Sequence, residues 1–524
     1  MDDFIPICQY DKDTYIGGSL REIKLLQQEK LNMTFEEFKE LAKPGYIVPV
    51  YRKINADFIT PVMAYLKMRD LGTYSFLLES VEKGEQIGRY SFIGQNPYRV
   101  LVAEGHKTII KDYSHNHLLD KDIFTILKEE LDKYKNVSID GIPQFFCGTV
   151  GFIGYEMIRC IEDLPEPKED IVKADDAIMA FYDSLITFDH LRNEVIIIAN
   201  TFIDNDSDLS RLYQDAQNRL LIQFEKLNRP LQTDLSFSAD INSEKSNFQK
   251  EDFKKAVEKS KEYIFAGDIF QVVLSQKFQV DYSGDIFQVY RALRNINPSP
   301  YMFYLDFIDY QIIGSSPESV ISSKDQQLEI IPIAGTRPRG QNSAEDEAHV
   351  KSLLADPKEN AEHIMLVDLA RNDMGRISEY GSVEVSDFRT IEKYSHVMHI
   401  ISRVHGKMRE DKTSVDAFKS AFPAGTVSGA PKIRAMEIIH EFEPDKRGFY
   451  AGAIGYFNYG GNMDMAIAIR TMLAKDGKIY YQAGAGIVAD SVPETEYQET
   501  LNKGRALRKA IEQATGGFYD FIHR

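Results

Sequence analysis

The sequence predicts an α+β protein rather than a doubly wound parallel sheet. β-rich runs at residues 74–80, 149–158 and 185–203 alternate with charged helical stretches, without a strict βαβ rhythm. The 524 residues are enough for one large domain or two to three ordinary ones. A content of 43% hydrophobic and 27% charged residues is typical of a globular protein. No apolar run reaches the roughly 20 residues that span a bilayer.

The chain begins with a weakly patterned arm or extra leader, residues 1–32. Thr34 and Glu37 then have the spacing of a capping box and predict an amphipathic helix. The N-terminal region at 33–228 continues with mixed strands and helices. Within it, residues 190–193 predict a hairpin turn between two strands.

A polar segment separates this region from the rest of the chain. After a predicted helix at 208–227, residues 229–248 have no periodicity and predict a linker. An amphipathic helix at 249–266 then leads into a strand at 269–280. These two elements open the last region, residues 249–516.

Charge and cysteine content narrow the classes of function. The formal net charge of −18 argues against a nucleic-acid partner, which would require a basic face. An anionic substrate would need a local positive pocket or a metal ion. Cys8, Cys147 and Cys160 show no CxxC spacing, which indicates a reducing compartment and no zinc site. The N-terminus lacks the pattern of a signal peptide, so we expect a cytoplasmic location.

The most informative run is FPAGTVSGAPKIRAME at residues 422–437. Its glycines and prolines are unsuited to the interior of a helix or strand. We expect a structured loop in which Ser428 or Gly429 opens the next helix, with Pro431 in the first turn. Alone, the run indicates only an anion-binding turn. Similar dense runs occur at residues 330–340, 362–373, 452–457 and 482–500.

Two pairs of glutamates have helical spacing. Glu359 and Glu362 lie three residues apart, as do Glu496 and Glu499. This spacing places each pair on one helix face, and two such faces could offer oxygen ligands to Mg²⁺. From spacing alone, a solvated helix surface is the more common explanation.

Two glycine-containing runs predict backbone donors for an anion. Gly484, Ala485 and Gly486 predict a tight turn whose N–H groups can approach an anion closely. Gly335 and Thr336 predict a similar contact. Either run, taken by itself, is better explained as a plain turn.

Together these runs resemble the chorismate-utilising enzymes, and within them the family of anthranilate synthase large subunits. The resemblance covers nearly all of residues 250–510. It implies large mixed and antiparallel sheets packed face to face, with helices outside and the active site in a cleft between the sheets.

The resemblance also implies a metal site. The second glutamate of each pair, Glu362 and Glu499, would ligate Mg²⁺, with Glu359 and Glu496 behind them. The ion would bind one carboxylate of chorismate. Arg470, at the end of an apolar strand, would bind a substrate carboxylate.

Acid–base roles follow from the same resemblance. Glu318 matches the general acid that protonates the departing C4 hydroxyl, and His399 matches the residue that assists the elimination, with Thr336 beside the reacting ring. The binding positions implied are Gly335, Thr336, Tyr450, Gly484, Ala485, Gly486, Lys503 and Gln271.

Two positions separate the related activities. Relatives that add water carry a lysine where this chain has Gln271, and relatives that make the 4-amino product carry a lysine where it has Ala334. The resemblance therefore implies addition of ammonia at C2, which gives anthranilate. The chain has no GxCxG elbow, so a separate glutamine amidotransferase subunit would supply ammonia in a heterodimer or heterotetramer. The alternatives are an aminodeoxychorismate synthase subunit and a non-catalytic tryptophan sensor.

Two segments resemble those that bind tryptophan as a feedback inhibitor. Ser80 falls in the first segment, and Pro300, Tyr301 and Met302 fall in the second. The second segment is also consistent with a proline-fixed turn carrying a core aromatic residue.

Overall fold

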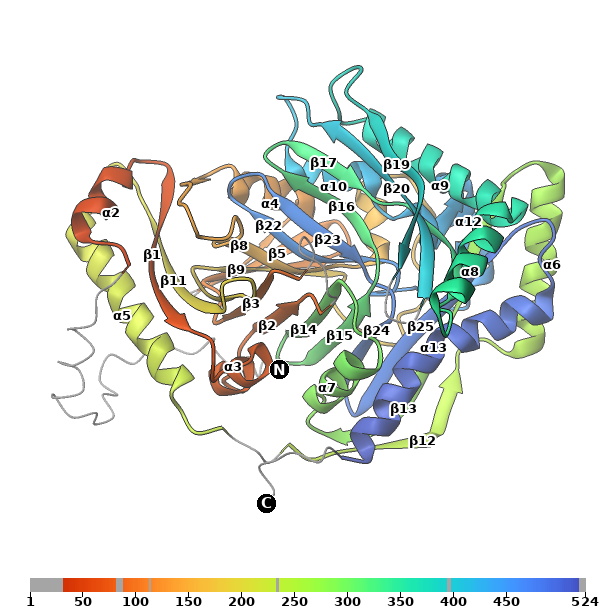
Figure 1. The fold of residues 1–524 in the computed structure, drawn as a ribbon, viewed down its shortest axis with the longest axis horizontal. Helices are drawn as coiled ribbons and strands as arrows, with labels where there is room; N and C mark the ends of the chain where they lie inside the picture. Colours follow the sequence, from red (N-terminus) through yellow and green to blue (C-terminus); the bar gives the residue numbers. More distant parts are fainter. Residues whose placement is uncertain (1–31, 82–87, 113–114, 232–234, 394–396, 518–524) are drawn as a thin grey trace.

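The computed structural model describes residues 32–81, 88–112, 115–231, 235–393 and 397–517. The predicted arm at 1–32 thus lies almost entirely outside the described residues. Within them, two large sheets carry helices on their outer sides (Figure 1). The predicted α+β class is confirmed.

The first sheet is mixed, because β7 pairs in parallel with β1 whereas the other strand pairs of this sheet are antiparallel. In spatial order its strands are β12 (Phe237–Ser246), β13 (Gln271–Gly284), β25 (Lys478–Ile487), β24 (Thr471–Lys475), β15 (Tyr310–Ser316), β14 (Tyr301–Asp306), β2 (Ser75–Glu79), β3 (Tyr90–Gln95), β10 (Ser184–Asp189), β11 (Glu194–Phe202), β1 (Tyr46–Asn55) and β7 (Lys135–Asn136), with β21 (Gly429–Ala430) beside β13.

The second sheet is antiparallel. Its strands are β18 (Ile333–Pro338), β20 (Val397–Lys407), β17 (Gln327–Ile330), β16 (Ser319–Lys324), β23 (Met463–Ile467), β22 (Ala453–Asn458), β8 (Gly148–Ile153), β9 (Ala177–Tyr182), β4 (Arg99–Glu104), β5 (Lys107–Asp112) and β6 (Asn116–Leu119), with β19 (Glu384–Lys393) beside β20.

Aromatic side chains join the facing sides of the two sheets. Phe76 of β2 meets Tyr182 of β9 edge to face, with ring centroids 4.8 Å apart. Phe92 of β3 meets Tyr456 of β22 at 6.2 Å. Such pairs bury large apolar areas, so one continuous core fills the space between the sheets. Because both the N-terminal and the last region contribute strands to each sheet, this core does not divide at the polar segment.

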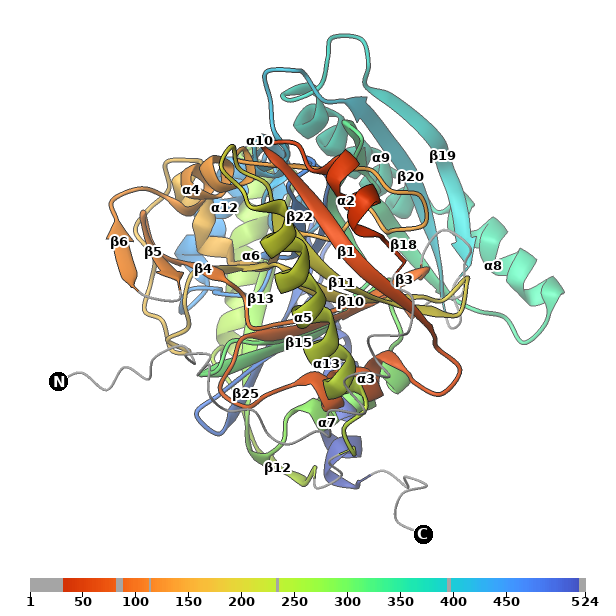
Figure 2. The same ribbon diagram turned by 90° about the vertical axis from the view of Figure 1, so that its left-hand side faces the viewer.

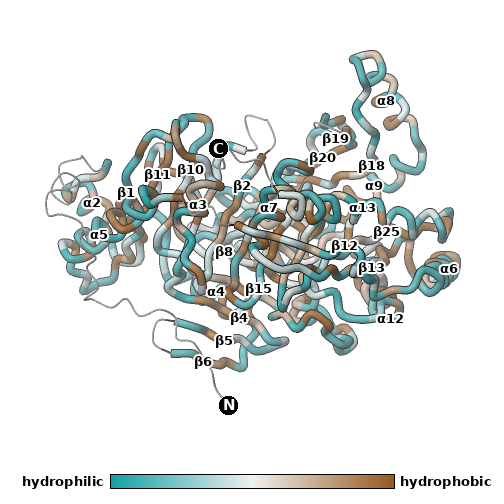
Figure 3. The backbone as a smooth tube through the Cα atoms, turned by 90° about the horizontal axis from the view of Figure 1, so that it is seen from below, coloured by the Kyte–Doolittle hydropathy of each residue, from teal (hydrophilic) through white to brown (hydrophobic). Residues whose placement is uncertain are grey.

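Helices cover the outside. They are α2 (Phe35–Leu41), α3 (Pro61–Met68), α4 (Ile123–Leu131), the 3₁₀ turn η1 (Tyr155–Cys160), α5 (Leu209–Leu227), α6 (Lys250–Ala266), α7 (Phe287–Ile296), α8 (Ser343–Ala355), α9 (Pro357–Gly375), α10 (Ser414–Ala421), α11 (Gly425–Ser428), α12 (Lys432–Phe442) and α13 (Pro493–Thr515). Helix α5 lies across β1 and β11 (Figure 2). The outlying α6 and α8 are mostly hydrophilic, as their exposure requires (Figure 3).

Several local predictions are confirmed. Thr34 and Glu37 form both hydrogen bonds of a capping box at α2. The helix predicted at 208–227 is α5, capped by Asp208. Strands β10 and β11 pair antiparallel around the predicted turn at 190–193.

Two local predictions are wrong. Half of the predicted linker, residues 237–246, is strand β12, whose exposure alternates along most of its length. It is polar because it is an edge strand with one face in solvent. In the glycine-rich run, Ser428 ends the short helix α11, and Pro431 is the N-cap of α12 rather than part of its first turn.

Two of the places where the chain crosses between the sheets are adjacent. From β15 in the first sheet it passes through Pro317 and Glu318 to β16 in the second. From β23 in the second sheet it returns through residues 468–470 to β24 in the first. These crossings, side by side, hold the candidate site between the sheets.

Candidate active site

The two crossings are hydrogen-bonded to each other. The N–H of Ile467 donates to the carbonyl of Glu318 over 2.9 Å, and the N–H of Ser315 donates to the carbonyl of Arg470 over 3.2 Å. Arg470 has a left-handed φ of 49°. It lies just beyond β23, whose apolar strand ends at Ile467. Backbone pairing therefore fixes the predicted acid and the predicted carboxylate-binding cation relative to one another.

Glu318 is a half-buried carboxyl suited to hold a proton at neutral pH. Burial raises its pKa from 4.5 to about 7, against the opposing influence of the Thr426 hydroxyl and of the cations Lys503 and Arg470. Groups from α11, α13 and the second crossing thus converge on it. A carboxyl that is about half protonated near pH 7 can act as a general acid there.

His399 lies on β20 next to the bulge of β18 that contains Gly335 and Thr336. Its Nδ1 is 3.0 Å from the Gly335 carbonyl and 3.0 Å from the Thr336 hydroxyl. Gly335 has φ 67°, which the bulge requires and glycine permits. Burial, and then Arg470, lowers the pKa of His399, while the Gly335 carbonyl opposes this. The imidazole is therefore neutral at pH 7, and a proton on Nδ1 leaves Nε2 as the acceptor.

Both glutamate pairs lie on helices, as predicted. Glu359 and Glu362 are on α9, and Glu496 and Glu499 are on α13. The Gln271 amide donates to Glu362 over 3.2 Å. The charge of Lys358 on α9 lowers the pKa of Glu496 on α13, so these two side chains lie near each other.

Lys503 connects α13 with the sheet. Its ammonium lies 2.8 Å from the carboxylate of Glu499 and donates to the Gly484 carbonyl over 3.0 Å. Its charge also reaches Glu362 and Glu318. Lys503 and Arg470 supply the local positive charge that a chain of net charge −18 would need for an anionic substrate.

The carboxylates are compatible with Mg²⁺. Among the described residues, no group of three or more His, Cys, Asp or Glu side chains is arranged around one point. Mg²⁺ commonly takes only one or two protein carboxylates and completes its shell with water and substrate oxygens. Burial, with Glu359 nearby, raises the pKa of Glu362, and the buried Gln271 Oε1 beside it has no hydrogen-bond partner within the described part of the chain. Both observations indicate a shortage of positive charge at this place, which a bound cation would relieve.

The predicted turn at Gly484, Ala485 and Gly486 is wrong. The three residues lie inside β25, paired with Ser275, Leu274 and Val273 of β13. Glycine is needed here for space rather than for a turn. A Cβ on Gly484 would lie 2.8 Å from the Tyr450 hydroxyl, and one on Gly486 would lie 2.6 Å from Gln271 Nε2. The glycines therefore let two predicted binding side chains lie against the strand.

Pairing along β25 also leaves one edge open at this place. β24 pairs with β25 only as far as Tyr481, whereas β13 continues to Ile487. Backbone groups on that edge, beyond Tyr481, are free of the β24 ladder and face the region of Lys503. They can still serve as the anion contacts that were predicted for a turn.

The two predicted tryptophan segments are neighbours. β2 pairs with β14 so that Glu79 lies opposite Met302, and Val81 N–H donates to the Ser299 carbonyl over 3.4 Å. Pro300 immediately precedes β14. The hydroxyl of Ser80 is buried without a partner among the described residues. The Tyr301 hydroxyl donates to Asp464 of β23 over 3.1 Å, which links the two sheets.

Sequence reasoning missed three contributors. Thr426, beside Glu318, lies in the glycine-rich run at 422–437, in which no residue was predicted to have a catalytic or binding role. Asn297 accepts from Arg470 over 3.1 Å. Arg447 and Glu443 form a buried ion pair behind the site. No local pattern marks Asn297, because its partner Arg470 is distant in sequence, and the four-residue spacing of Glu443 and Arg447 does not show that this pair is buried.

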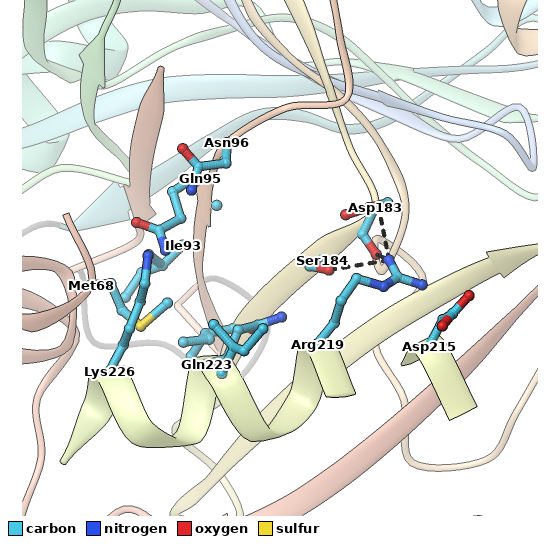
Figure 4. A pocket seen from close by; sticks show the side chains of 13 residues that line it. Met68, Ile93, Gln95, Asn96, Asp183, Ser184, Asp215, Arg219, Gln223 and Lys226 are labelled. Carbon is cyan, nitrogen blue, oxygen red and sulfur yellow. Dashed lines mark hydrogen bonds and ion pairs between the residues drawn. The ribbon is translucent and has the colours of Figure 1, made fainter. Parts of the chain in front are cut away.

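A cavity of about 340 Å³ lies elsewhere, between α5 and the β3–β10 pair (Figure 4). Its cations are already paired, Arg219 with Asp183 and Lys226 with Asp70. None of the predicted site residues lines it. The convergence of groups at the two crossings, rather than cavity size, therefore identifies the candidate active site.

In the described residues no helix is long and apolar enough to cross a membrane. Comparison with known proteins gives a consistent result. Residues 73–509 match the family model described as chorismate binding enzyme. The chain is 47% identical to anthranilate synthase component 1 from Acetivibrio thermocellus, over 92% of this chain and 98% of that protein.

Solved structures show the same fold. Anthranilate synthase component I from Streptococcus pneumoniae superposes with a TM-score of 0.72 at 38% identity, covering 87% of this chain and 99% of that one. The isochorismate synthase MenF from Escherichia coli gives 0.67 at 17% identity, covering 94% and 98%, which shows the fold alone.

Proposed function

Since the chain belongs to the chorismate-binding enzyme family, among the anthranilate synthase component 1 proteins, we propose that it converts chorismate and ammonia to anthranilate and pyruvate with Mg²⁺. The observation that carries this proposal is the convergence on Glu318 of Thr426, Lys503 and Arg470. A proton donor and two cations at one place suit a dianion that must lose a hydroxyl group.

The first chemical stage forms a C–N bond at C2 and breaks the C4–O bond. Ammonia attacks C2, the ring double bonds shift, and the hydroxyl leaves C4 as water after accepting the proton of Glu318. Hydroxide is a poor leaving group, so this proton transfer is essential. Lys503 and Arg470 hold the substrate carboxylates, and the hydroxyl of Thr336 lies beside the substrate ring.

The second stage aromatises the ring. The neutral His399 imidazole is suited to accept the C2 proton. The C3–O bond then breaks, and the enolpyruvyl group takes up a proton at its methylene carbon and leaves as pyruvate. Glu362 and Glu499 would hold Mg²⁺, with Glu359 and Glu496 behind them. When bound, the ion supplies positive charge for a substrate carboxylate.

Gln271 and Ala334 favour ammonia over water as the nucleophile. Gln271 is 4% exposed and donates to Glu362, so a neutral amide lies where a lysine base would activate water. Ala334 leaves no amine before Gly335. The rival activity, aminodeoxychorismate synthesis, would retain the side chain and release no pyruvate.

A separate glutaminase subunit would supply the ammonia. Of the described cysteines, Cys147 is buried, and burial raises its thiol pKa well above the ordinary value. Burial raises the pKa of Cys160 to about 12. Neither thiol is suited to act as the thiolate nucleophile that glutamine hydrolysis needs.

Tryptophan would act as a feedback inhibitor bound between the segments that contain Ser80 and residues 300–302. Among the described residues the buried Ser80 hydroxyl has no hydrogen-bond partner, which supports a ligand there. Asn297, three residues before Pro300, accepts a hydrogen bond from Arg470. A shift of this segment on tryptophan binding would therefore move a substrate-binding cation, which couples the two sites.

One assay tests the proposal. The purified chain is incubated with chorismate, Mg²⁺ and ammonium at alkaline pH, where neutral ammonia is available, and anthranilate fluorescence is followed. Anthranilate should form from ammonium and not from glutamine. Gln271→Lys should weaken amination, because a new cation would lie on the nucleophile's side of the ring. Absence of product would favour the non-catalytic sensor, and a product without pyruvate would favour the rival activity.

A further inference from the structure

A buried cation lies directly behind the candidate active site. The side chain of Arg447 is 1% exposed. Its guanidinium makes cation–π contacts with two rings, whose centroids are 4.8 Å away for Tyr155 and 5.5 Å away for Tyr450. Tyr450 is itself a predicted substrate contact, whose hydroxyl lies against Gly484.

The guanidinium donates to two separate walls of the site. One Nη1–H bonds the Val427 carbonyl over 2.7 Å, and one Nη2–H bonds the Val273 carbonyl over 2.7 Å. Val427 follows Thr426, whose hydroxyl lies near enough to Glu318 to affect its pKa but makes no hydrogen bond among the described residues. Val273 lies two residues from Gln271 on β13, so the two side chains are on the same face of the strand.

Glu443 completes this arrangement. It accepts from Arg447 Nε over 2.9 Å and Nη2 over 2.6 Å. It also accepts from the N–H and hydroxyl of Ser275, over 2.9 and 2.7 Å. The Gln482 amide donates to the same hydroxyl over 2.7 Å, which extends the network to β25 two residues before Gly484.

Stability alone does not explain this pair. A buried ion pair can commonly be replaced by apolar residues with little loss of stability, because desolvation offsets the attraction. What an apolar pair cannot do is fix two carbonyls and a carboxylate at defined angles. The planar guanidinium fork does this, and a lysine does not.

We propose that Arg447, held by Glu443, is a positioning residue that fixes the 426–427 segment and β13 around the substrate. This role rests on the proposed function. Arg447 touches no reacting group itself. It acts through the Val427 carbonyl, which sets the place of the Thr426 hydroxyl beside Glu318, and through the Val273 carbonyl, which sets the place of Gln271.

Two variants test the role. Arg447→Lys keeps the charge but loses the fork. Arg447→Met with Glu443→Gln removes both charges and keeps an acceptor for Ser275. In each, we expect kcat/KM for chorismate to fall at least tenfold, mainly through kcat, while the chain still folds, at some cost in melting temperature because two buried carbonyls lose their donor.

A pH profile distinguishes positioning from general damage. Thr426, Lys503 and Arg470 all lower the pKa of Glu318. If Thr426 moves away, that pKa rises, and the alkaline limb of kcat/KM shifts to higher pH. Lys503 and Arg470 are unchanged in these variants, so the shift reports the 426–427 segment.

The chain offers a matched control. Lys277 and Asp445 form a second buried ion pair, 2% and 7% exposed, that also joins β13 to the segment after α12. Lys277 also donates to the Lys446 carbonyl over 2.7 Å, and among the described residues neither side chain contacts a predicted site residue. Lys277→Met with Asp445→Asn should leave kcat/KM and the pH limb near their wild-type values.

The outcomes separate the two hypotheses. Folded Arg447 variants with wild-type kcat/KM and an unmoved limb would overturn the positioning role. So would an equal loss in the control pair, or failure of both variants to fold, since the role requires an effect separable from stability. Absence of anthranilate from the wild-type chain would instead refute the proposed function.

Discussion

Replacing Glu318 by glutamine should stabilise the protein at alkaline pH while abolishing its activity. Burial raises the pKa of Glu318 from 4.5 to about 7. Between these values the unfolded chain has released the proton while the folded chain retains it, so the free energy of unfolding falls as the pH rises through this window. A shift from 4.5 to about 7 corresponds to about 3 kcal/mol. Glutamine keeps the neutral shape of the protonated acid and does not titrate.

The measurement is urea unfolding of wild type and Glu318→Gln at a series of pH values from 5 to 9. The difference in unfolding free energy should grow in favour of the variant by about 2 kcal/mol or more between pH 5 and pH 8, then level off. Other titrating groups are common to both chains and cancel in this difference. If the difference in unfolding free energy does not change with pH, the pKa of Glu318 is not raised by folding. That result would remove the basis for its role as the general acid.

Three further outcomes are expected. Glu362→Ala or Glu499→Ala should abolish Mg²⁺-dependent turnover with little change in the thermal melt, because each removes an oxygen ligand; near-normal activity in either would refute the metal assignment. Ser80→Phe should relieve tryptophan inhibition, because the larger side chain would occupy the place of the ligand. If calorimetric titration of the wild type detects no tryptophan binding, the regulatory site is refuted. Gly486→Ala should reduce kcat/KM at least tenfold, because its Cβ would lie 2.6 Å from the Gln271 amide; wild-type kinetics would show that this amide can move without consequence.

The sequence predicted correctly those elements that depend on residues close together in the chain. The capping box at Thr34 and Glu37 and the helix that ends at Leu227 depend on residues within a few positions of each other. Strand β12 could not be predicted in this way. It is polar along one face because it lies at the sheet edge, and its place at that edge depends on pairing with β13.

In the candidate site, too, some residues could be placed from local sequence patterns and others could not. The spacing of Glu359 and Glu362 placed both on one helix, and α9 confirms this placement. The tight turn predicted for residues 484–486 was wrong, because a glycine run has two physical uses. It can supply a turn, or it can remove side chains where other groups approach a strand, and only the Tyr450 and Gln271 contacts show which applies.

The burial of the Arg447–Glu443 ion pair could not be predicted from the sequence. Arg447 and Glu443 are four residues apart, a spacing that most often indicates an exposed helical pair. Here Glu443 is the C-cap of α12, and the pair is buried because β13 and α11 close over it. Nothing in the sequence around Glu443 and Arg447 specifies their contacts with β13 and α11.

Burial of Glu318 has two effects that reinforce each other. The substrate is a dianion, and the chain has a net charge of −18, so an ionised carboxylate beside Arg470 would repel the ligand that this cation is to bind. Held neutral, the same carboxyl leaves the charge of Arg470 and Lys503 available to the substrate. The bound dianion would in turn disfavour ionisation of Glu318 and raise its pKa further. Substrate binding and retention of the proton therefore favour each other, so the acid is most fully protonated in the complex where its proton is needed.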